Sequence, residues 1–464
     1  MKGQDIEALG IPSGKAVQMA QKTIGKALKS GMTLTDFQET LKKIAVNPLE
    51  WVEDSLFEDI AKVCLQKVAT FEERENPAPW RQWGEDLDAG SITQMENACR
   101  LPISEAGALM PDAHLGYGLP IGGVLATEGA VIPYAVGMDI ACRMKLSVFD
   151  YPVESLEIAH ADLCKVLERE TAFGVGRGFQ RIPDHKVMSE DWGITEVTRK
   201  AKKKAHNQLG SSGSGNHFVE FGPITLEKED LGLRPGTYLA VMSHSGSRGA
   251  GSDVASFYSK LAKELHPELP KDLQNLSWLD LDSSEGQEYW AAMELMGRYA
   301  AANHDIIHWN ISRALRSQVI AQVENHHNFA WKETHFGKEV IVHRKGATPA
   351  GAGVLGVIPG SMASPAYVVR GRGSHEAMDS ASHGAGRVMS RKQASKVLSW
   401  PEIRQKLQDA GVHLLSAGLD EAPDVYKDIE VVMEQQKDLV EPIARFEPRI
   451  VKMAPPGRSG GVKT

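Results

Sequence analysis

The chain has 464 residues, an apolar content of 42% and a formal net charge of −8. This length fits one large domain or two to three ordinary ones, and the apolar content is enough to fill a sizeable core. The negative charge argues against a protein that coats nucleic acid through bulk charge, so we expect any contact with nucleic acid to be local.

The first 75 residues are predicted to form a helical N-terminal extension. Apolar residues recur at spacings of three and four in "LTDFQETLKKIAV" (34–46) and "SLFEDIAKVCLQKVATF" (55–71). The following "NPAPW" (76–80) is predicted to be a linker, because two prolines in five residues cannot continue a helix. The extension is either a packing or dimerisation appendage or a module that selects a ligand, and its sequence does not choose between these roles.

The remainder, residues 80–464, is predicted to be one large α+β domain. Short β-branched runs such as 340–343 and "TYLAVMSHSG" (237–246) alternate with glycine clusters. The longest stretch predicted to be helical covers 286–323. In this pattern we expect the polar chemistry to lie on the loops.

Cysteine usage predicts a cytoplasmic protein. The cysteines lack C-x-x-C spacing, which is typical of a reducing compartment rather than of a disulfide scaffold. The start of the chain lacks the apolar core of a signal peptide, and no apolar run reaches the length of a membrane span. We therefore expect no membrane partner. The four cysteines are Cys64, Cys99, Cys142 and Cys164.

The segment "GMDIACRM" contains a candidate metal-binding pair. Asp139 and Cys142 are three residues apart, so both side chains can face the same way on one helical turn or a tight loop. A carboxylate with a thiolate suits a borderline divalent metal such as Mn, Fe, Co or Zn, and the thiolate can bridge two ions. The alternative is a buried structural cysteine beside a capping aspartate.

Three further segments carry histidines beside glycine or asparagine. They are "GSGNHFVEFG", "MSHSGSRGAG" and "ENHHNFAW", which contribute His217, His244 and His327. Each histidine alone is equally well explained as a satisfied polar residue in a core or turn. Together with the Asp139 and Cys142 pair, they could hold two ions that share one thiolate.

Two segments are candidates for binding phosphate. The turn "PGSM" (359–362) could bind an anion through its backbone amides and the Ser361 hydroxyl, or it could be a surface loop. Neither a Walker A motif nor a G-x-G-x-x-G fingerprint is present, which disfavours the common nucleotide-binding folds. The basic run at 199–204 is either a solvated helix face or a track for an RNA backbone.

The stretch "DSASHGAGRVMSR" (379–391) places His383 among serines and glycines. Glycine lets backbone approach a ligand closely, and guanidiniums such as that of Arg387 often bind phosphate, so we expect this segment to contact a ligand.

In their order along residues 80–455, these motifs resemble those of the RtcB family of GTP-dependent RNA ligases. The motifs that carry the resemblance are "MPDAHLGYGLPIGG" (110–123), the D-x-x-C of Asp139 and Cys142, "GNHFVE" (215–220), "HSGSRG" (244–249), "HHN" (326–328), "HRKGAT" (343–348), "PGSM" (359–362) and "SHGAGRVMSR" (382–391).

The resemblance implies a catalytic domain of packed β-sheets flanked by helices, with a central cleft for two Mn²⁺ ions. Asp139, Cys142 and His217 would hold the first ion, and Cys142, His244 and His327 the second. His383 would attack the α-phosphorus of GTP as the nucleophile. The residues implied to bind the guanylate are Asn216, His217, Phe218, Val219, Glu220, His327, Asn328, Pro359, Gly360, Ser361, Met362, His383, Gly384, Ala385, Gly386 and Lys452.

The implied reaction joins an RNA 3′-phosphate or 2′,3′-cyclic phosphate end to a 5′-hydroxyl end, in RNA repair or tRNA processing. An alternative is an enzyme that guanylylates RNA 3′ ends without sealing them, and a third is a metal-stabilised RNA-binding protein without activity. The sequence does not identify an activating protein partner.

The chain departs from the family pattern at several positions. Ala141 and Arg143 replace two glycines of the usual D-x-G-C-G-M motif, and Ala366 lacks a hydroxyl that is usual near the nucleotide. Asn303 and His304 stand where an asparagine–arginine pair is usual. We expect Arg143 either to approach the substrate phosphate or to change which RNA ends enter the site.

Overall fold

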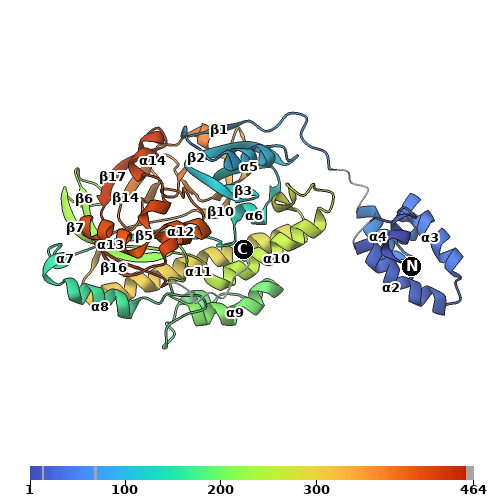
Figure 1. Ribbon diagram of the computed structural model, residues 1–464, viewed down its shortest axis with the longest axis horizontal. Helices are drawn as coiled ribbons and strands as arrows, with labels where there is room; N and C mark the ends of the chain where they lie inside the picture. Colours follow the sequence, from blue (N-terminus) through green and yellow to red (C-terminus); the bar gives the residue numbers. More distant parts are fainter. Residues whose placement is uncertain (13–14, 67–70, 456–464) are drawn as a thin grey trace. The chain divides into compact units, whose positions relative to one another are not determined.

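The computed structural model describes residues 1–12, 15–66 and 71–455 (Figure 1). Contacts between these residues divide the chain into two compact units. The smaller unit comprises Met1–Glu73 and Glu264–Lys271, and the larger comprises Arg74–Lys263 and Asp272–Thr464. Among the described residues, no helix combines the length and apolar character needed to cross a membrane.

The smaller unit is built from helices, as the apolar periodicity predicts. A capping box starts α3, since the Thr33 hydroxyl accepts from the amide of Asp36 while the Asp36 carboxylate accepts from the amide of Thr33. Phe37 is fully buried, and its ring lies 5.6 Å from that of Phe57. The helices are α1 (Gly3–Glu7), α2 (Lys15–Lys29), α3 (Leu34–Val46), the 3₁₀ turn η1 (Pro48–Trp51) and α4 (Glu58–Gln66).

The larger unit contains two main sheets, which agrees with the predicted α+β class. The first is ordered β1 (Trp80–Gln82), β2 (Ser104–Tyr117), β3 (Leu119–Thr127), β11 (Lys338–Lys345), β10 (Asn328–His335). The second is ordered β13 (Leu355–Pro359), β14 (Ala366–Gly371), β17 (Val440–Phe446), β6 (Phe218–Leu226), β7 (Gly236–Ser245), β5 (Arg143–Phe149), β9 (Val319–His326), while β18 (Ile450–Met453) pairs with β6 and with β16 (His413–Ser416).

Two short ladders, ten α-helices and five 3₁₀ helices complete the described part of this unit; the 3₁₀ helices are η2 (Lys186–Ser189), η3 (Gln274–Leu276), η4 (His375–Ala377), η5 (Leu419–Glu421) and η6 (Pro423–Val425). The ladders join β12 (Ala347–Pro349) to β15 (Ser380–Ser382) and β4 (Ala130–Val131) to β8 (Leu279–Asp280). The α-helices are α5 (Ala89–Cys99), α6 (Pro133–Val136), α7 (Ser155–Ile158), α8 (His160–Glu170), α9 (Glu196–Gln208), α10 (Arg248–Leu265), α11 (Ser284–Leu315), α12 (Arg391–Val397), α13 (Trp400–Asp409) and α14 (Ile429–Gln435).

The second sheet has two chemically different faces, because successive side chains of a strand point to opposite sides. One face packs against α8 and α11, where Val241 of β7 shares a buried core with Leu163 and Ile307. On the other face, Met144 and Met242 belong to a separate buried core. We call these the helix face and the cavity face.

Two expectations about local structure need correction. The long helix does not extend to residue 323: α11 ends at Leu315, Arg316 adopts a left-handed φ of 54°, and the chain enters β9 at Val319. The β-branched residues there pair with β5, and this sheet pairing outweighs the helical periodicity. The segment 76–80 is not a free linker either, since the amide of Ala78 bonds the carbonyl of Cys99 and β1 begins at Trp80.

The packing of Phe37 predicts a local effect of mutation. Phe37→Ala removes a fully buried aromatic ring and should destabilise the smaller unit by about 3 kcal/mol or more. Hydrogen exchange of the full chain should show faster exchange across α2–α4, with no change across the second sheet. The matched control is Leu34→Ala on the same helix, since the Leu34 side chain is 46% exposed. Equal effects of the two variants would contradict the assigned packing.

Candidate metal and nucleotide site

Sheet register brings the predicted metal ligands together. Cys142 immediately precedes β5, which lies between β7 and β9. Met144 of β5 is opposite His244 of β7, and the amide of His327 donates to the carbonyl of Cys142 at 3.0 Å. Asp139 closes a turn onto Cys142, whose amide donates to the Asp139 carbonyl. The predicted local approach of Asp139 and Cys142 is therefore present.

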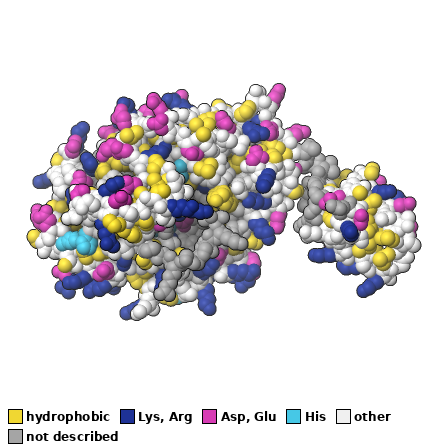
Figure 2. Space-filling view, in the orientation of Figure 1, with side chains coloured by type: hydrophobic (Ala, Val, Ile, Leu, Met, Phe, Trp, Pro, Cys, Tyr) yellow, Lys and Arg dark blue, Asp and Glu magenta, His cyan; other side chains and the backbone are white. Residues whose placement is uncertain are grey.

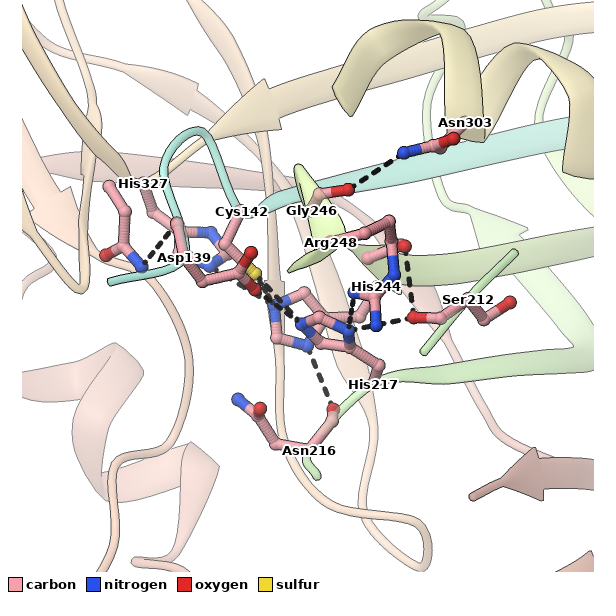
Figure 3. A network of polar contacts seen from close by, with 12 residues as sticks. Asp139, Cys142, Ser212, Asn216, His217, His244, Gly246, Arg248, Asn303 and His327 are labelled. Carbon is pink, nitrogen blue, oxygen red and sulfur yellow. Dashed lines mark hydrogen bonds and ion pairs between the residues drawn. The ribbon is translucent and has the colours of Figure 1, made fainter. Parts of the chain in front are cut away.

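The donor atoms of these residues converge around the Cys142 sulfur (Figure 3). Cys142 Sγ lies 3.3 Å from His217 Nε2 and 3.1 Å from His244 Nε2. Asp139 Oδ2 is 2.9 Å from His217 Nε2, and the Nε2 atoms of His244 and His327 are 3.2 Å apart. The five residues form two groups of three that share Cys142, namely Asp139–Cys142–His217 and Cys142–His244–His327.

Contacts behind the ligands orient two of the imidazoles. His244 Nδ1 lies 3.0 Å from the carbonyl of Asn216, so it donates there and leaves a lone pair on Nε2. His217 Nδ1 lies 2.8 Å from the Ser212 carbonyl and 2.9 Å from Arg248 Nη1. The Nε2 atoms are thereby directed at the sulfur.

Burial sets the protonation of the cluster. It lowers the pKa of His244 to about 3 and that of His327 well below the usual value, so both imidazoles are neutral. Burial alone would raise the pKa of Asp139, but the hydrogen bond and charge of His217 bring it to about 2. Burial and the Asp139 carboxylate raise the pKa of Cys142, so an ion that binds here displaces a thiol proton.

These residues fit a pair of borderline divalent cations. Donor atoms about 3 Å apart are at the separation expected of ligands that share one ion. A carboxylate, a thiolate and neutral imidazoles suit Mn²⁺, Fe²⁺, Co²⁺ or Zn²⁺, and each group of three leaves coordination positions open. Nδ1 of His327 has no hydrogen-bond partner among the described residues, although it is buried.

A cavity of about 300 Å³ adjoins the cluster on the cavity face of the sheet. His244 lines the cavity and also belongs to the cluster, so the two sites are continuous. Burial raises the pKa of Glu220 in the wall to about 8. The predicted nucleotide residues that line the cavity are Asn216, Phe218, Glu220, Pro359, Gly360, Ser361, Met362, His383, Gly384, Ala385 and Gly386.

His383 is held at the cavity wall by an aspartate that the sequence analysis did not assign. Asp112 Oδ2 lies 2.6 Å from His383 Nδ1 and accepts from the His383 amide at 3.2 Å. Asp112 is fully buried. A carboxylate on Nδ1 selects the tautomer with a free lone pair on Nε2, which is the nucleophilic form of imidazole. The His383 ring lies 4.9 Å from that of His327.

Two glycines near His383, Gly386 and Gly346, also meet a packing requirement within the protein. A Cβ atom at Gly386 would lie 2.1 Å from the carbonyl oxygen of Asp112, and Gly386 has a φ of +73°. At Gly346 a Cβ would lie 2.4 Å from Ile121 and 3.2 Å from the His383 ring. Close contact between protein segments therefore accounts for both glycines.

Several protein groups that were predicted to bind phosphate form hydrogen bonds with other residues of the protein instead. The Arg387 guanidinium donates to the carbonyl of Asp420 at 2.7 Å and to Glu421. In the "PGSM" turn, the amide of Gly360 bonds the Pro365 carbonyl and that of Ser361 bonds the Ser364 hydroxyl. The turn therefore offers hydroxyl and apolar surface to the cavity rather than a row of free amides.

Five predicted nucleotide-binding residues, Lys452 among them, do not line the cavity. His217 and His327 lie in the cluster, and Val219 belongs to the helix-face core. The amide oxygen of Asn328 accepts from Gly346 at 2.8 Å, and its Nδ2 faces the Asp139 carbonyl. Asn328 thus clamps the loop that carries the metal ligands.

Lys452 also lies on the helix face, whereas its neighbours Val451 and Met453 line the cavity. Its amine donates to carbonyls at the end of α8, and burial lowers its pKa to about 8. The three acceptors are the carbonyls of Leu167, Glu168 and Thr171.

The departures from the family pattern have structural explanations. Ala141 has a φ of 54°, a left-handed conformation that favours glycine. Arg143 is buried and pairs with Glu324 of β9 at 3.5 Å, and Lys145 of the same strand pairs with Asp305. Residues 143 and 145 alternate with Met144 of the cavity face, so the guanidinium is on the face away from the cavity.

The structure also shows the contacts of the other departures, which are the Asn303–His304 pair and Ala366. Asn303 of α11 donates to the Gly246 carbonyl and accepts from the Gly210 amide, while His304 Nδ1 is 2.7 Å from the Ser243 hydroxyl. Asn303 therefore ties α11 to the loops beside the cluster, and His304 ties it to β7. Ala366 lines the cavity with a methyl group where the family usually has a hydroxyl.

Asp112 was missed because one aspartate in a glycine-rich motif has no spacing that marks it. Its motif, "MPDAHLGYGLPIGG", contributed only to the family resemblance. A signal was nevertheless available: a nucleophilic histidine requires a partner on its second nitrogen, and this motif offers an aspartate without another role.

Comparison with known proteins identifies the family. Residues 94–453 match the family model described as "tRNA-splicing ligase RtcB". The RNA-splicing ligase RtcB of Escherichia coli K12 is 36% identical over 402 residues, which cover 79% of this chain and 95% of that protein. The tRNA-splicing ligase RtcB of Thermococcus kodakarensis is 31% identical over 437 residues, covering 77% of this chain and 90% of that protein. The chain therefore belongs to the RtcB family of RNA-splicing ligases.

Proposed function

We propose that this RtcB-family ligase joins RNA 3′-phosphate or 2′,3′-cyclic phosphate ends to 5′-hydroxyl ends through a guanylate on His383, with GTP and two Mn²⁺ ions. The observation that carries the proposal is the Asp112–His383 pair, which stands at the cavity wall beside the cluster. RNA repair and tRNA processing are the predicted settings, and cytoplasmic localisation remains a prediction.

In the first step, His383 Nε2 attacks the α-phosphorus of GTP and pyrophosphate leaves. Asp112 holds the Nδ1 proton, so the attacking nitrogen has its lone pair available and the positive charge that develops on the ring is balanced. Imidazole also leaves readily from phosphorus. The RNA 3′-phosphate then attacks the guanylate and releases His383, and the 5′-hydroxyl finally displaces GMP.

The proposed Mn²⁺ ions would be held by Asp139, Cys142 and His217 and by Cys142, His244 and His327, where divalent cations supply charge neutralisation and alignment of phosphate oxygens. The residues of this chain position those donors through strands β5, β6 and β7 and the turns beside them.

Glu220 is proposed to recognise the nucleobase. Its buried carboxyl group in the cavity wall is suited to N–H groups of guanine, because hydrogen bonds from such donors favour the ionised carboxylate. A direct contact between Lys452 and the nucleotide, as the family resemblance implies, would require its amine to leave the three carbonyls at the end of α8.

The first prediction concerns the nucleophile. Incubation with α-labelled GTP and Mn²⁺ should label the protein, and the label should be labile in acid and stable in alkali, as expected of a phosphorus–nitrogen bond. His383→Ala should abolish labelling because no other side chain would attack. His375→Ala, an exposed histidine on the neighbouring 3₁₀ turn, is the control that should keep it. Persistent labelling of His383→Ala would overturn the assignment.

An end-joining assay distinguishes an enzyme that seals RNA ends from one that only guanylylates them. RNA with a 3′-phosphate is supplied with and without a second RNA that carries a 5′-hydroxyl. Joined product is expected when both ends are present. Guanylylated RNA that is never joined would favour the alternative capping enzyme. Arg143 gives that alternative no support, since its guanidinium pairs with Glu324 on the face away from the cavity.

The second prediction concerns the metals. Cys142 belongs to both groups of three, whereas Asp139 and His327 each belong to one. Cys142→Ala should therefore lose both Mn²⁺ ions, while Asp139→Ala and His327→Ala should each lose one. Calorimetric titration with Mn²⁺ measures the number bound. A Cys142→Ala protein that binds as many ions as Asp139→Ala would show that the thiolate is not shared.

The third prediction concerns Asp112 as a positioning residue. Asp112→Asn should slow guanylylation about 100-fold or more, because the amide can present a donor to Nδ1 and stabilise the wrong tautomer. The KM for GTP should change little, since Asp112 does not line the cavity. Single-turnover labelling measures both quantities, with Asp86→Asn, an exposed carboxylate, as the control. A loss confined to KM would contradict the positioning role.

A further inference from the structure

A second group of metal-ligating side chains lies outside the site described above. His160, Cys164 and His413 each offer a ligand atom, and these atoms lie within 4.8 Å of one another. Cys164 Sγ is 3.9 Å from His160 Nδ1, and the rings of His160 and His413 are 4.8 Å apart. Figure 2 shows histidine side chains gathered at the surface over α8 and β16.

The backbone fixes these three residues independently of any ion. His160 and Cys164 are four apart on α8 and so share one helix face. Leu163, Val166 and Leu167 bury the adjoining face of α8 in the helix-face core, and the partly buried Cys164 side chain packs against the edge of that core. His413 begins β16, where its amide donates to the Arg449 carbonyl at 2.7 Å.

The surroundings leave the group available to a cation. His413 is exposed and His160 and Cys164 are partly exposed, so an ion can enter from solvent. The guanidinium of Arg449, which lines a hollow together with His160, is engaged with Glu447 at 2.7 Å and with the carbonyl of Ala410. Glu168 on the next turn of α8 adds negative charge near the thiol.

We propose that His160, Cys164 and His413 form a surface site for Zn²⁺ or a cation of similar softness, which joins the start of α8 to β16. Two imidazoles and one thiolate are ligands that Zn²⁺ and Co²⁺ bind, and a fourth position remains for water. Mn²⁺ stands lowest in the affinity order for such ligands, so we expect this site to bind Zn²⁺ more tightly than Mn²⁺.

Binding has a defined proton balance. The sulfur–metal bond forms as the Cys164 thiol loses its proton to solvent, and both imidazoles bind as neutral ligands. No oxidant or reductant takes part. Both elements that the ion would join also contact Lys452. Carbonyls at the end of α8 accept hydrogen bonds from its amine, and β16 pairs with β18 so that Ser416 is opposite Lys452.

The experiment follows the reactivity of one thiol in the full-length protein. Cys164 is the only cysteine in the tryptic peptide 146–165, so mass spectrometry measures its alkylation separately from that of Cys142. The purified protein, stripped of metal, is treated with iodoacetamide alone, with ZnCl₂ or with MnCl₂. ZnCl₂ should slow alkylation of Cys164 roughly tenfold or more, because a coordinated thiolate is not free to react, whereas MnCl₂ should not.

Variants separate the three-residue site from a thiol that binds zinc alone. His160→Gln and His413→Gln should each lose most of the protection, while His206→Gln, an exposed histidine on α9, should behave as wild type. Circular dichroism confirms that each variant is folded. Unchanged alkylation in the presence of ZnCl₂, or equal protection in the wild type and both variants, would overturn the proposal.

Discussion

The alternation of side chains across the second sheet is the constraint on which the site depends. Strands β6, β7 and β18 each send one set of residues to the cavity and the other to the helix face, and β5 sends Met144 to the cavity face and Phe149 to the helix face. His244 therefore faces the cavity and Ser243 faces α11. A shift of one residue in the pairing of β5 with β7 would exchange these sets and separate the metal ligands.

The same alternation explains which residue roles could be predicted from the sequence. The ligands were predictable because each lies in a motif with a distinctive residue type, and Asp139 and Cys142 are also close in the chain. The direction of the Lys452 side chain was not predictable, because a motif match does not say on which face of a strand a residue lies. In a strand over residues 449–453, the alternation of side chains places Lys452 on the opposite face from Val451.

Contacts between distant segments account for the other differences. Asp112 and His383 lie far apart in the sequence, so no local sequence pattern predicts their hydrogen bond. Similarly, the end of α11 at Leu315 is decided by the pairing of β9 with β5 rather than by the helical periodicity of the sequence. The fold class follows from composition and pattern, whereas partners and boundaries depend on tertiary packing.

The positions of the ligands along the chain also give the site an order of assembly during synthesis. A chain emerging from the ribosome has every ligand of the Asp139–Cys142–His217 group once His217 has been made. The second group must wait for His327, and His383 follows later still. Because β5 gains its β9 partner only after α11 is complete, the donors proposed for both ions come together before His383, the proposed nucleophile, is in place.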